Sequence, residues 1–134
     1  MKVAVDSSVL LDVLGADPVH GERSREALRT AYDTGALVAC EIVWAEVRAH
    51  FKSDAEFSEA MKLLGIRFEA IFDDAAAKAG QLWRELRREP GAARIRVVAD
   101  LLIGAHALIQ SDALLTRDRG FYRSRFKGLR IVEP

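Results

Sequence analysis

The sequence predicts an α/β fold, a three-layer α/β/α sandwich with a mainly parallel central sheet, as a single domain over residues 1–134. Two observations predict it. Short hydrophobic runs alternate with segments of helical periodicity, and no Pro-, Gly- or Ser-rich linker or internal repeat interrupts that alternation. A chain of 134 residues can bury a substantial core but is too short for two ordinary domains.

The first half of the chain begins with a β-branched run that ends at Asp6. Asp6 and the two serines after it can cap a helix, and Gly15 and Gly35 can end the next two helices. A fully apolar run after Gly35 predicts a buried strand. The expected elements are a strand over 2–5, helices over 9–14 and 20–34, a strand over 36–39, and helices over 41–51 and 54–64.

The second half repeats the alternation. Pro90-Gly91 is expected to stop a long helix, and Asp112 precedes another apolar run. The expected elements are a strand near 67–71, helices over 73–88 and 96–110, and strands over 113–116 and 129–132. Because ligands bind beyond the carboxyl ends of the strands in parallel sheets, residues that follow these strands are candidates for a site.

Composition excludes several classes of protein. Net charge is zero, so a protein that coats nucleic acid non-specifically is not expected. The single cysteine, Cys40, excludes an internal disulfide and a Cys-cluster zinc site, and its place at the end of an apolar run predicts an inert core thiol. The N-terminus turns acidic too early for a signal peptide, and the longest apolar stretch, 101–109, is too short to span a bilayer. We therefore expect a soluble cytoplasmic protein without membrane contact.

The basic residues are concentrated late in the chain. Residues 1–67 carry 8 Lys and Arg against 11 Asp and Glu, whereas residues 68–134 carry 12 against 9. Between Thr116 and Pro134 the only acids are Asp118 and Glu133. This region can contact phosphate, and a solvated arginine-rich face is the alternative.

Four carboxylates lie in stretches that are expected to be buried, and they are Asp6, Glu46, Asp100 and Asp118. Asp6 follows the first strand directly, and Asp118 stands two residues past the strand over 113–116. Both therefore emerge where a parallel sheet is expected to bind a ligand.

The other two carboxylates interrupt apolar helix faces. At 100° per residue, Glu46 falls on the inward half of its helix near Val43, with Arg48 on the opposite side. Asp100 is flanked by small or apolar residues, among them Gly104, which would let another element approach closely.

Together these acids favour a divalent cation site. Two carboxylates about 4 Å apart repel by roughly 4 kcal/mol at the effective dielectric of a partly buried site. Oxygen ligands suit Mg²⁺ or Mn²⁺, whereas zinc usually takes His or Cys. Each acid also has an explanation of its own: a helix cap at Asp6, a turn at Asp118, pairing of Glu46 with His50, and the helix dipole at Asp100. None of these explains why the four occur together.

The acids and their flanks resemble the PIN-domain family of metal-dependent ribonucleases, in particular the VapC-type toxins of bacterial type II toxin-antitoxin pairs, over nearly the whole chain. The matching segments are 5–8 (Val-Asp-Ser-Ser), 44–47 (Trp-Ala-Glu-Val), 100–107 (Asp-Leu-Leu-Ile-Gly-Ala-His-Ala) and 116–121 (Thr-Arg-Asp-Arg-Gly-Phe). The third departs from the family pattern only at Gly104, where Ala is usual.

The resemblance implies a metal-dependent endoribonuclease that cleaves RNA phosphodiester bonds, the toxin of a toxin-antitoxin pair that inhibits translation. It implies that the four acids hold one or two Mg²⁺ or Mn²⁺ ions, which activate a water molecule for in-line attack. Asp6 and Asp100 would touch the metal directly, Glu46 would bind it or orient the water, and Asp118 could act through a water molecule.

The resemblance also implies supporting residues and partners. Ser8 and Thr116 would hydrogen-bond the carboxylates or their waters, and Arg117 and Arg119 would grip RNA phosphate. A small cognate antitoxin would cover the acidic groove with its C-terminal segment, and the chain would form homodimers.

Three alternatives stay open from the residues. Asp6 could be the nucleophile of a phosphatase or phosphotransferase, although Ser8 stands where a D-x-D pattern requires a second Asp. A PIN-like domain could act without catalysis, through protein contacts. Glu46, His50 and His106 could bind zinc, although no H-E-x-x-H motif is present.

Overall fold

The computed structural model of the chain describes residues 1–89 and 96–134 and confirms an α/β fold with a parallel central sheet. The elements in this described part are β1 (Lys2–Val5), α1 (Ser7–Leu14), α2 (Gly21–Thr34), β2 (Ala36–Ala39), α3 (Glu41–Arg48), α4 (Asp54–Leu64), β3 (Ile66–Phe68), α5 (Asp73–Arg87), α6 (Arg96–Gln110), β4 (Ala113–Leu115), α7 (Arg119–Arg125) and β5 (Ile131–Val132).

The sheet has the strand order β3-β2-β1-β4-β5, and every neighbouring pair is parallel. β1, β2 and β4 are almost wholly buried, which explains why they read as continuous apolar runs. The chain moves outward from β1 to β2 and β3 on one side, then returns to place β4 and β5 on the other. The carboxyl ends of β1 and β4 therefore form the topological switch point of the sheet, where open α/β folds bind ligands.

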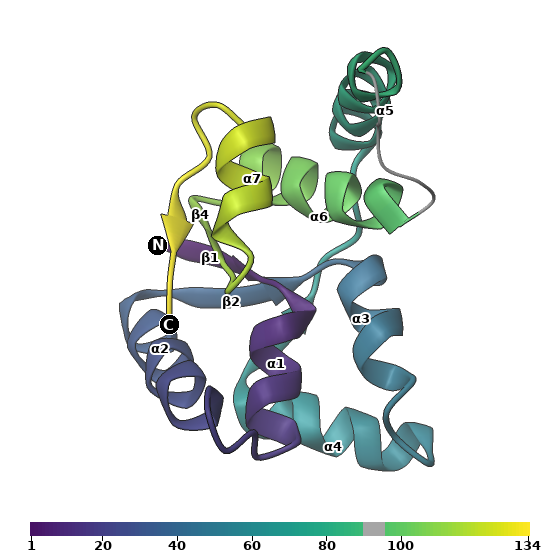
Figure 1. Cartoon of the computed structure of the whole chain (residues 1–134). Helices are drawn as coiled ribbons and strands as arrows, with labels where there is room; N and C mark the ends of the chain where they lie inside the picture. The colour runs from purple at the N-terminus through teal and green to yellow at the C-terminus, as the bar shows by residue number, and fades with distance from the viewer. Residues whose placement is uncertain (90–95) are drawn as a thin grey trace.

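Helices cover both faces of the sheet (Figure 1). In this view α1, α2 and α4 lie below the strands, whereas α6 and α7 lie above them. α1 packs against α2 and α3, and α6 packs against β1, β4 and α5. α3 also contacts α6, so the helices that carry Glu46 and Asp100 approach each other near the ends of the strands.

Most predicted elements agree with the structure, but α7 was not predicted. Gly120 and its arginine-rich surroundings lack a helical apolar pattern, and a seven-residue helix is too short to show one. α3 ends at Arg48, three residues before the expected end at Phe51. The predicted helix stop at Pro90-Gly91 lies outside the described residues.

Cys40 is a buried free thiol just before α3, as predicted. Burial raises the pKa of its thiol, which keeps it protonated and unreactive. Within residues 1–89 and 96–134 there is no helix whose length and apolar character would let it cross a membrane.

Gly104 leaves room on α6 for the ring of Phe126. It lies one turn after Asp100, and a Cβ atom at this position would come within 2.3 Å of Cε2 of Phe126. Phe126 directly follows α7 and is itself buried, so its ring cannot move aside freely. The absence of a side chain at Gly104 therefore lets the Phe126 ring pack directly on α6.

We expect Gly104→Ala to destabilise the protein by about 1–3 kcal/mol, because overpacking against Phe126 outweighs the gain in helix propensity. Gly80→Ala in α5 is the matched control, since a Cβ there would meet nothing within 4 Å. The free energy of unfolding of that variant should rise by about 0.5–1 kcal/mol. Urea unfolding of both variants measures the difference, and equal free energies of unfolding would contradict the close-packing argument.

Candidate functional site

The candidate site lies at the switch point between β1 and β4. Asp6 directly follows β1, and its backbone N–H donates to the carbonyl oxygen of Leu115 at 3.0 Å. This bond continues the β1–β4 pairing past the end of β1 and brings Asp6 beside Thr116. Asp6 also caps α1, because its side chain accepts a hydrogen bond from the N–H of Ser7.

The Asp6 carboxylate is buried and held by hydroxyl groups. Its Oδ2 accepts from Thr116 Oγ1 at 2.7 Å and from Ser8 Oγ at 3.4 Å, and its Oδ1 accepts from the Ser7 N–H at 2.8 Å. Asp6 is 6% exposed and Thr116 is fully buried. Ser8 and Thr116, the two predicted supporting hydroxyls, both contact this carboxylate.

Ser7 and Thr116 connect Asp6 to two of the other acids. The Ser7 hydroxyl donates to Glu46 Oε1 at 3.0 Å and lies 3.5 Å from Asp6 Oδ1. The Asp118 N–H donates to Thr116 Oγ1 at 2.9 Å. Ser8 was predicted because the resemblance places a hydroxyl residue two positions after the first Asp, whereas Ser7, which contacts Glu46, was not predicted.

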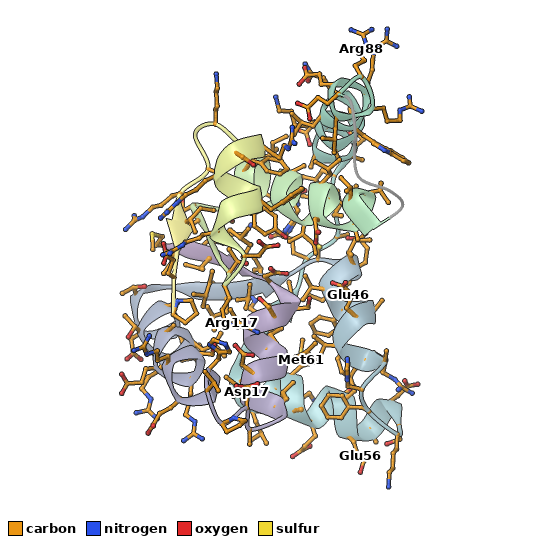
Figure 2. The ribbon with its side chains drawn as sticks, in the orientation of Figure 1. Asp17, Glu46, Glu56, Met61, Arg88 and Arg117 are labelled. Atoms are coloured by element: carbon orange, nitrogen blue, oxygen red, sulfur yellow. The ribbon has the colours of Figure 1, made fainter. Side chains whose placement is uncertain are left out.

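The prediction that all four acids are buried is wrong. Only Asp6 is buried; Asp100 is partly buried, and Glu46 and Asp118 are exposed. A helical wheel shows which side of a helix is more apolar, but it does not show whether that side is covered by the rest of the protein. Glu46 lies on α3 beyond the carboxyl end of β2, where the inward side of the helix is open to solvent. Figure 2 shows Glu46 projecting from α3. Solvent exposure at two acids reduces the repulsion that full burial would impose.

The electrostatics of the site centre on Asp6. Burial raises the pKa of its carboxyl, the hydrogen bonds from Thr116 and Ser7 oppose the rise, and the charges of Glu46 and Asp118 add to it. The cost of the ionised form is therefore partly desolvation and partly repulsion from the neighbouring acids. A cation would relieve both.

Tyr122 of α7 is a buried residue that the sequence analysis did not single out. Its ring is fully buried, and its hydroxyl has no hydrogen-bond partner among the described residues. Burial and the charges of the four acids all raise the pKa of this hydroxyl. The charges of all four predicted site residues thus act on the pKa of this one buried hydroxyl, and these residues are Asp6, Asp100, Asp118 and Glu46.

The residues fit a hard divalent cation in chemistry. Every candidate ligand is a carboxylate, and Mg²⁺ and Mn²⁺ prefer oxygen. Across residues 1–89 and 96–134, however, no three His, Cys, Asp or Glu side chains are arranged close enough to hold one metal ion as they stand. The Tyr122 hydroxyl is a buried polar group for which the described residues supply no hydrogen-bond partner.

Arg117 makes a structural ion pair. Its Nε and Nη2 atoms donate to Asp12 at 2.6 and 3.0 Å, and the Ser24 hydroxyl donates to the same carboxylate at 2.8 Å. Asp12 is only 4% exposed. Sequence reasoning missed Asp12, although it interrupts an apolar helix just as Asp100 does. In Figure 2 Arg117 lies beside α1, which carries Asp12.

Arg119 is also paired, but at the surface. It forms an ion pair with Glu133, which Arg123 shares. Both guanidinium groups that were predicted to bind RNA therefore already have a carboxylate partner, and their contact with RNA stays a prediction.

The zinc alternative is wrong for His106. This side chain is buried, and its Nε2 lies 3.0 Å from Glu69 Oε1. Desolvation lowers the pKa of His106 against the opposing effect of Glu69, which favours the neutral ring. His106 is therefore a core histidine with a carboxylate partner, and it does not join Glu46 and His50.

Comparison with known proteins gives a family match over most of the chain. The model of the PIN domain matches residues 3–127. No curated protein sequence matches the chain.

Solved structures share the fold at low sequence identity. VapBC2 from Rickettsia felis, bound to a DNA fragment from its promoter, is 16% identical with a TM-score of 0.77, over 100% of this chain and 99% of that chain. DNA-bound VapBC from Salmonella typhimurium is 17% identical with a TM-score of 0.70, over 99% and 98%. VapC20 from Mycobacterium tuberculosis, described as a sarcin-ricin loop cleaving toxin, is 16% identical with a TM-score of 0.59, over 96% and 98%.

The raised pKa of Asp6 predicts a pH dependence of stability in the metal-free protein. The folded state binds the Asp6 proton more tightly than the unfolded state, so this contribution is present below the usual pKa of 3.8 and is lost as pH rises through the folded value. Asp6→Asn cannot ionise, so it escapes the loss. In urea unfolding with EDTA between about pH 4 and 7, the free energy of unfolding of the variant should rise relative to that of the wild type as pH rises. A constant difference would contradict the pKa assignment.

Arg117→Ala should lower the free energy of unfolding by about 2 kcal/mol, because it leaves the buried Asp12 carboxylate with Ser24 as its one remaining partner among the described residues. Arg119→Ala is the matched control and should change stability by less than about 0.5 kcal/mol, since its ion pair is exposed. Thermal unfolding of both variants tests this, and equal effects would show that the Asp12 pair is not structural.

Proposed function

The chain belongs to the PIN-domain family, and from that premise we propose that it is a divalent-metal-dependent endoribonuclease, the toxin of a toxin-antitoxin pair that inhibits translation by cleaving RNA. One observation carries the proposal. The buried Asp6 carboxylate lies at the switch point of the sheet and is connected through Ser7 to Glu46 and through Thr116 to Asp118. The similar solved structures, which include a ribonuclease toxin, support the same activity.

The proposed cation ligands are the four carboxylates Asp6, Glu46, Asp100 and Asp118, which would hold one or two Mg²⁺ or Mn²⁺ ions. When bound, the cation would activate a water molecule for in-line attack and offset negative charge on the phosphodiester. Each carboxylate would supply negatively charged oxygen ligands, and a bound cation would offset the repulsion between them.

The chain's own residues prepare the site. Thr116 and Ser8 fix Asp6 Oδ2, so the buried carboxylate cannot rotate without losing two hydrogen bonds. Ser7 holds Glu46 Oε1 on the side of Asp6. Such hydrogen bonds around ligands commonly contribute 10–100-fold to metal affinity or activity.

The exposure of Glu46 and Asp118 suits a polymeric substrate. A fully enclosed cluster would exclude a phosphodiester flanked by nucleotides on both sides. With Asp6 at the base and two acids at the surface, the site is anchored on one side and open on the other.

Arg119 is the better candidate for RNA contact. Its side chain is 58% exposed, and a phosphate group could compete with Glu133 for it. Arg117 is committed to the buried Asp12, so engaging RNA would cost the protein part of its stability. We propose that Arg117 contributes mainly by placing the segment that leads to Asp118.

A small antitoxin is the proposed protein partner. Two of the similar solved structures are toxin-antitoxin complexes, VapBC2 and VapBC. An antitoxin segment that covers the acidic groove would have to bring positive charge to the four carboxylates. We propose homodimers by the same family analogy.

The structure gives little support to Asp6 as a phosphate-accepting nucleophile. Both carboxylate oxygens accept hydrogen bonds, and only 6% of the residue is exposed. Nucleophilic attack would require one oxygen to leave its donors and reach solvent.

Asp6→Asn and Asp100→Asn should each abolish Mg²⁺- or Mn²⁺-dependent RNA cleavage while leaving the fold intact. Each change removes one negative charge from the proposed ligand set and keeps the side-chain shape. Cleavage of a labelled RNA with Mg²⁺, Mn²⁺, Zn²⁺ or EDTA measures the activity, and circular dichroism checks the fold.

Asp33→Asn is the control for this experiment, because Asp33 is an exposed acid on α2 and has no role in the site. It should cleave RNA at the wild-type rate. Undiminished cleavage by either site variant would refute the ligand assignment. A wild-type protein without cleavage under any of these conditions would favour a non-catalytic interaction module.

A further inference from the structure

Tyr122 is fixed in place by its neighbours in and after α7. Its ring packs edge-on against Phe121, with 5.2 Å between centroids, and lies 6.1 Å from the ring of Phe126. Phe126 in turn fills the space that Gly104 leaves on α6. The Tyr122 hydroxyl therefore has a defined position relative to both α6 and α7.

The hydroxyl is energetically out of place without a partner. Tyr122 is 0% exposed, and its oxygen atom has no hydrogen-bond partner among the described residues. A buried unsatisfied hydroxyl costs about 1–3 kcal/mol, and buried tyrosines usually find an acceptor. Phenylalanine would fill the same space without this cost, so packing alone does not explain a tyrosine here.

The surroundings of the hydroxyl indicate what its partner is. Burial and the negative charges of the four acids keep its pKa high, so the group stays protonated and acts as a donor. The acids supply acceptor oxygens, but the described residues place none of them in a direct hydrogen bond with Tyr122. A water molecule can bridge groups that are too far apart for a direct bond, provided it has two to four polar partners.

We propose that Tyr122 is a positioning residue of the carboxylate site: its hydroxyl donates a hydrogen bond to a water molecule that the carboxylates also hold. This inference rests on the proposed metal-dependent function and adds a fifth residue to it. Tyr122 is buried, so it cannot touch the RNA, and it acts through the water and carboxylates at the cation site.

The test is Tyr122→Phe, which removes one oxygen atom and leaves the ring packing intact. Mn²⁺ is titrated into the RNA-free protein by calorimetry. We expect the Kd for Mn²⁺ to rise about 10-fold, as is usual when a hydrogen bond around metal ligands is lost. At Mn²⁺ concentrations well above both Kd values, the Mn²⁺-induced rise in Tm should shrink by about 5 °C.

A kinetic measurement separates positioning from substrate binding. With Mn²⁺ near the wild-type Kd, the variant should lose kcat for RNA cleavage while KM for RNA stays unchanged, because the hydroxyl is not accessible to RNA. Tyr32→Phe is the matched control, since Tyr32 is 55% exposed on α2. It should leave the Kd for Mn²⁺, the Tm increment and kcat at wild-type values.

Two results would overturn the inference. If Tyr122→Phe binds Mn²⁺ with a Kd within about twofold of the wild type and its metal-free form is more stable, the hydroxyl is simply an unsatisfied core group. That result leaves the proposed ribonuclease function standing, provided that the wild type binds Mn²⁺ and cleaves RNA. A wild-type protein that binds neither Mn²⁺ nor Mg²⁺ would overturn both proposals together.

Discussion

The parallel pairing of β1 with β4 is the constraint on which the candidate site depends. The bond from the Asp6 N–H to the Leu115 carbonyl extends this pairing past β1 and fixes Asp6 beside Thr116. From that point the Thr116 hydroxyl reaches the Asp6 carboxylate, and the Asp118 N–H reaches Thr116. Residues 110 positions apart in sequence thus share one hydrogen-bonded corner. No local propensity could bring them together.

The energetics of this corner run against folding. Asp6 is buried near other acids, and a group whose pKa is raised for that reason destabilises the folded state when it ionises. The rest of the domain offsets the cost with a closely packed apolar core, which includes the interior strands and the faces of α1, α3 and α6 that meet them. Proteins commonly accept such local costs at sites where function requires them.

The sequence predicted the fold well where its periodicity was long and unambiguous. β1, β2, α4 and α6 have the predicted bounds, because apolar runs or caps such as Gly65 mark their ends. α7 was missed because its seven residues are too few to show a period.

The four acids were found because carboxylates stand out in apolar segments, but the exposure of Glu46 depended on where α3 stops covering the sheet. Asp12 carried the same signal as Asp100 and turned out to hold Arg117, so only tertiary structure separates a structural acid from a site acid.

The contact between Gly104 and Phe126 makes two positions share one volume. Alanine is usual in the family at the place of Gly104, so a relative that has it must carry a smaller group where Phe126 stands or set the following helix farther out. The combined side-chain volume at the two positions is limited, so a larger residue at one position requires a smaller residue at the other. Any such exchange would also move Asp100 relative to Tyr122. Asp100 lies one turn before Gly104 on α6, and Tyr122 lies one turn before Phe126. Sequence drift at a plain packing contact could therefore retune the chemistry of the site without altering any of its acids.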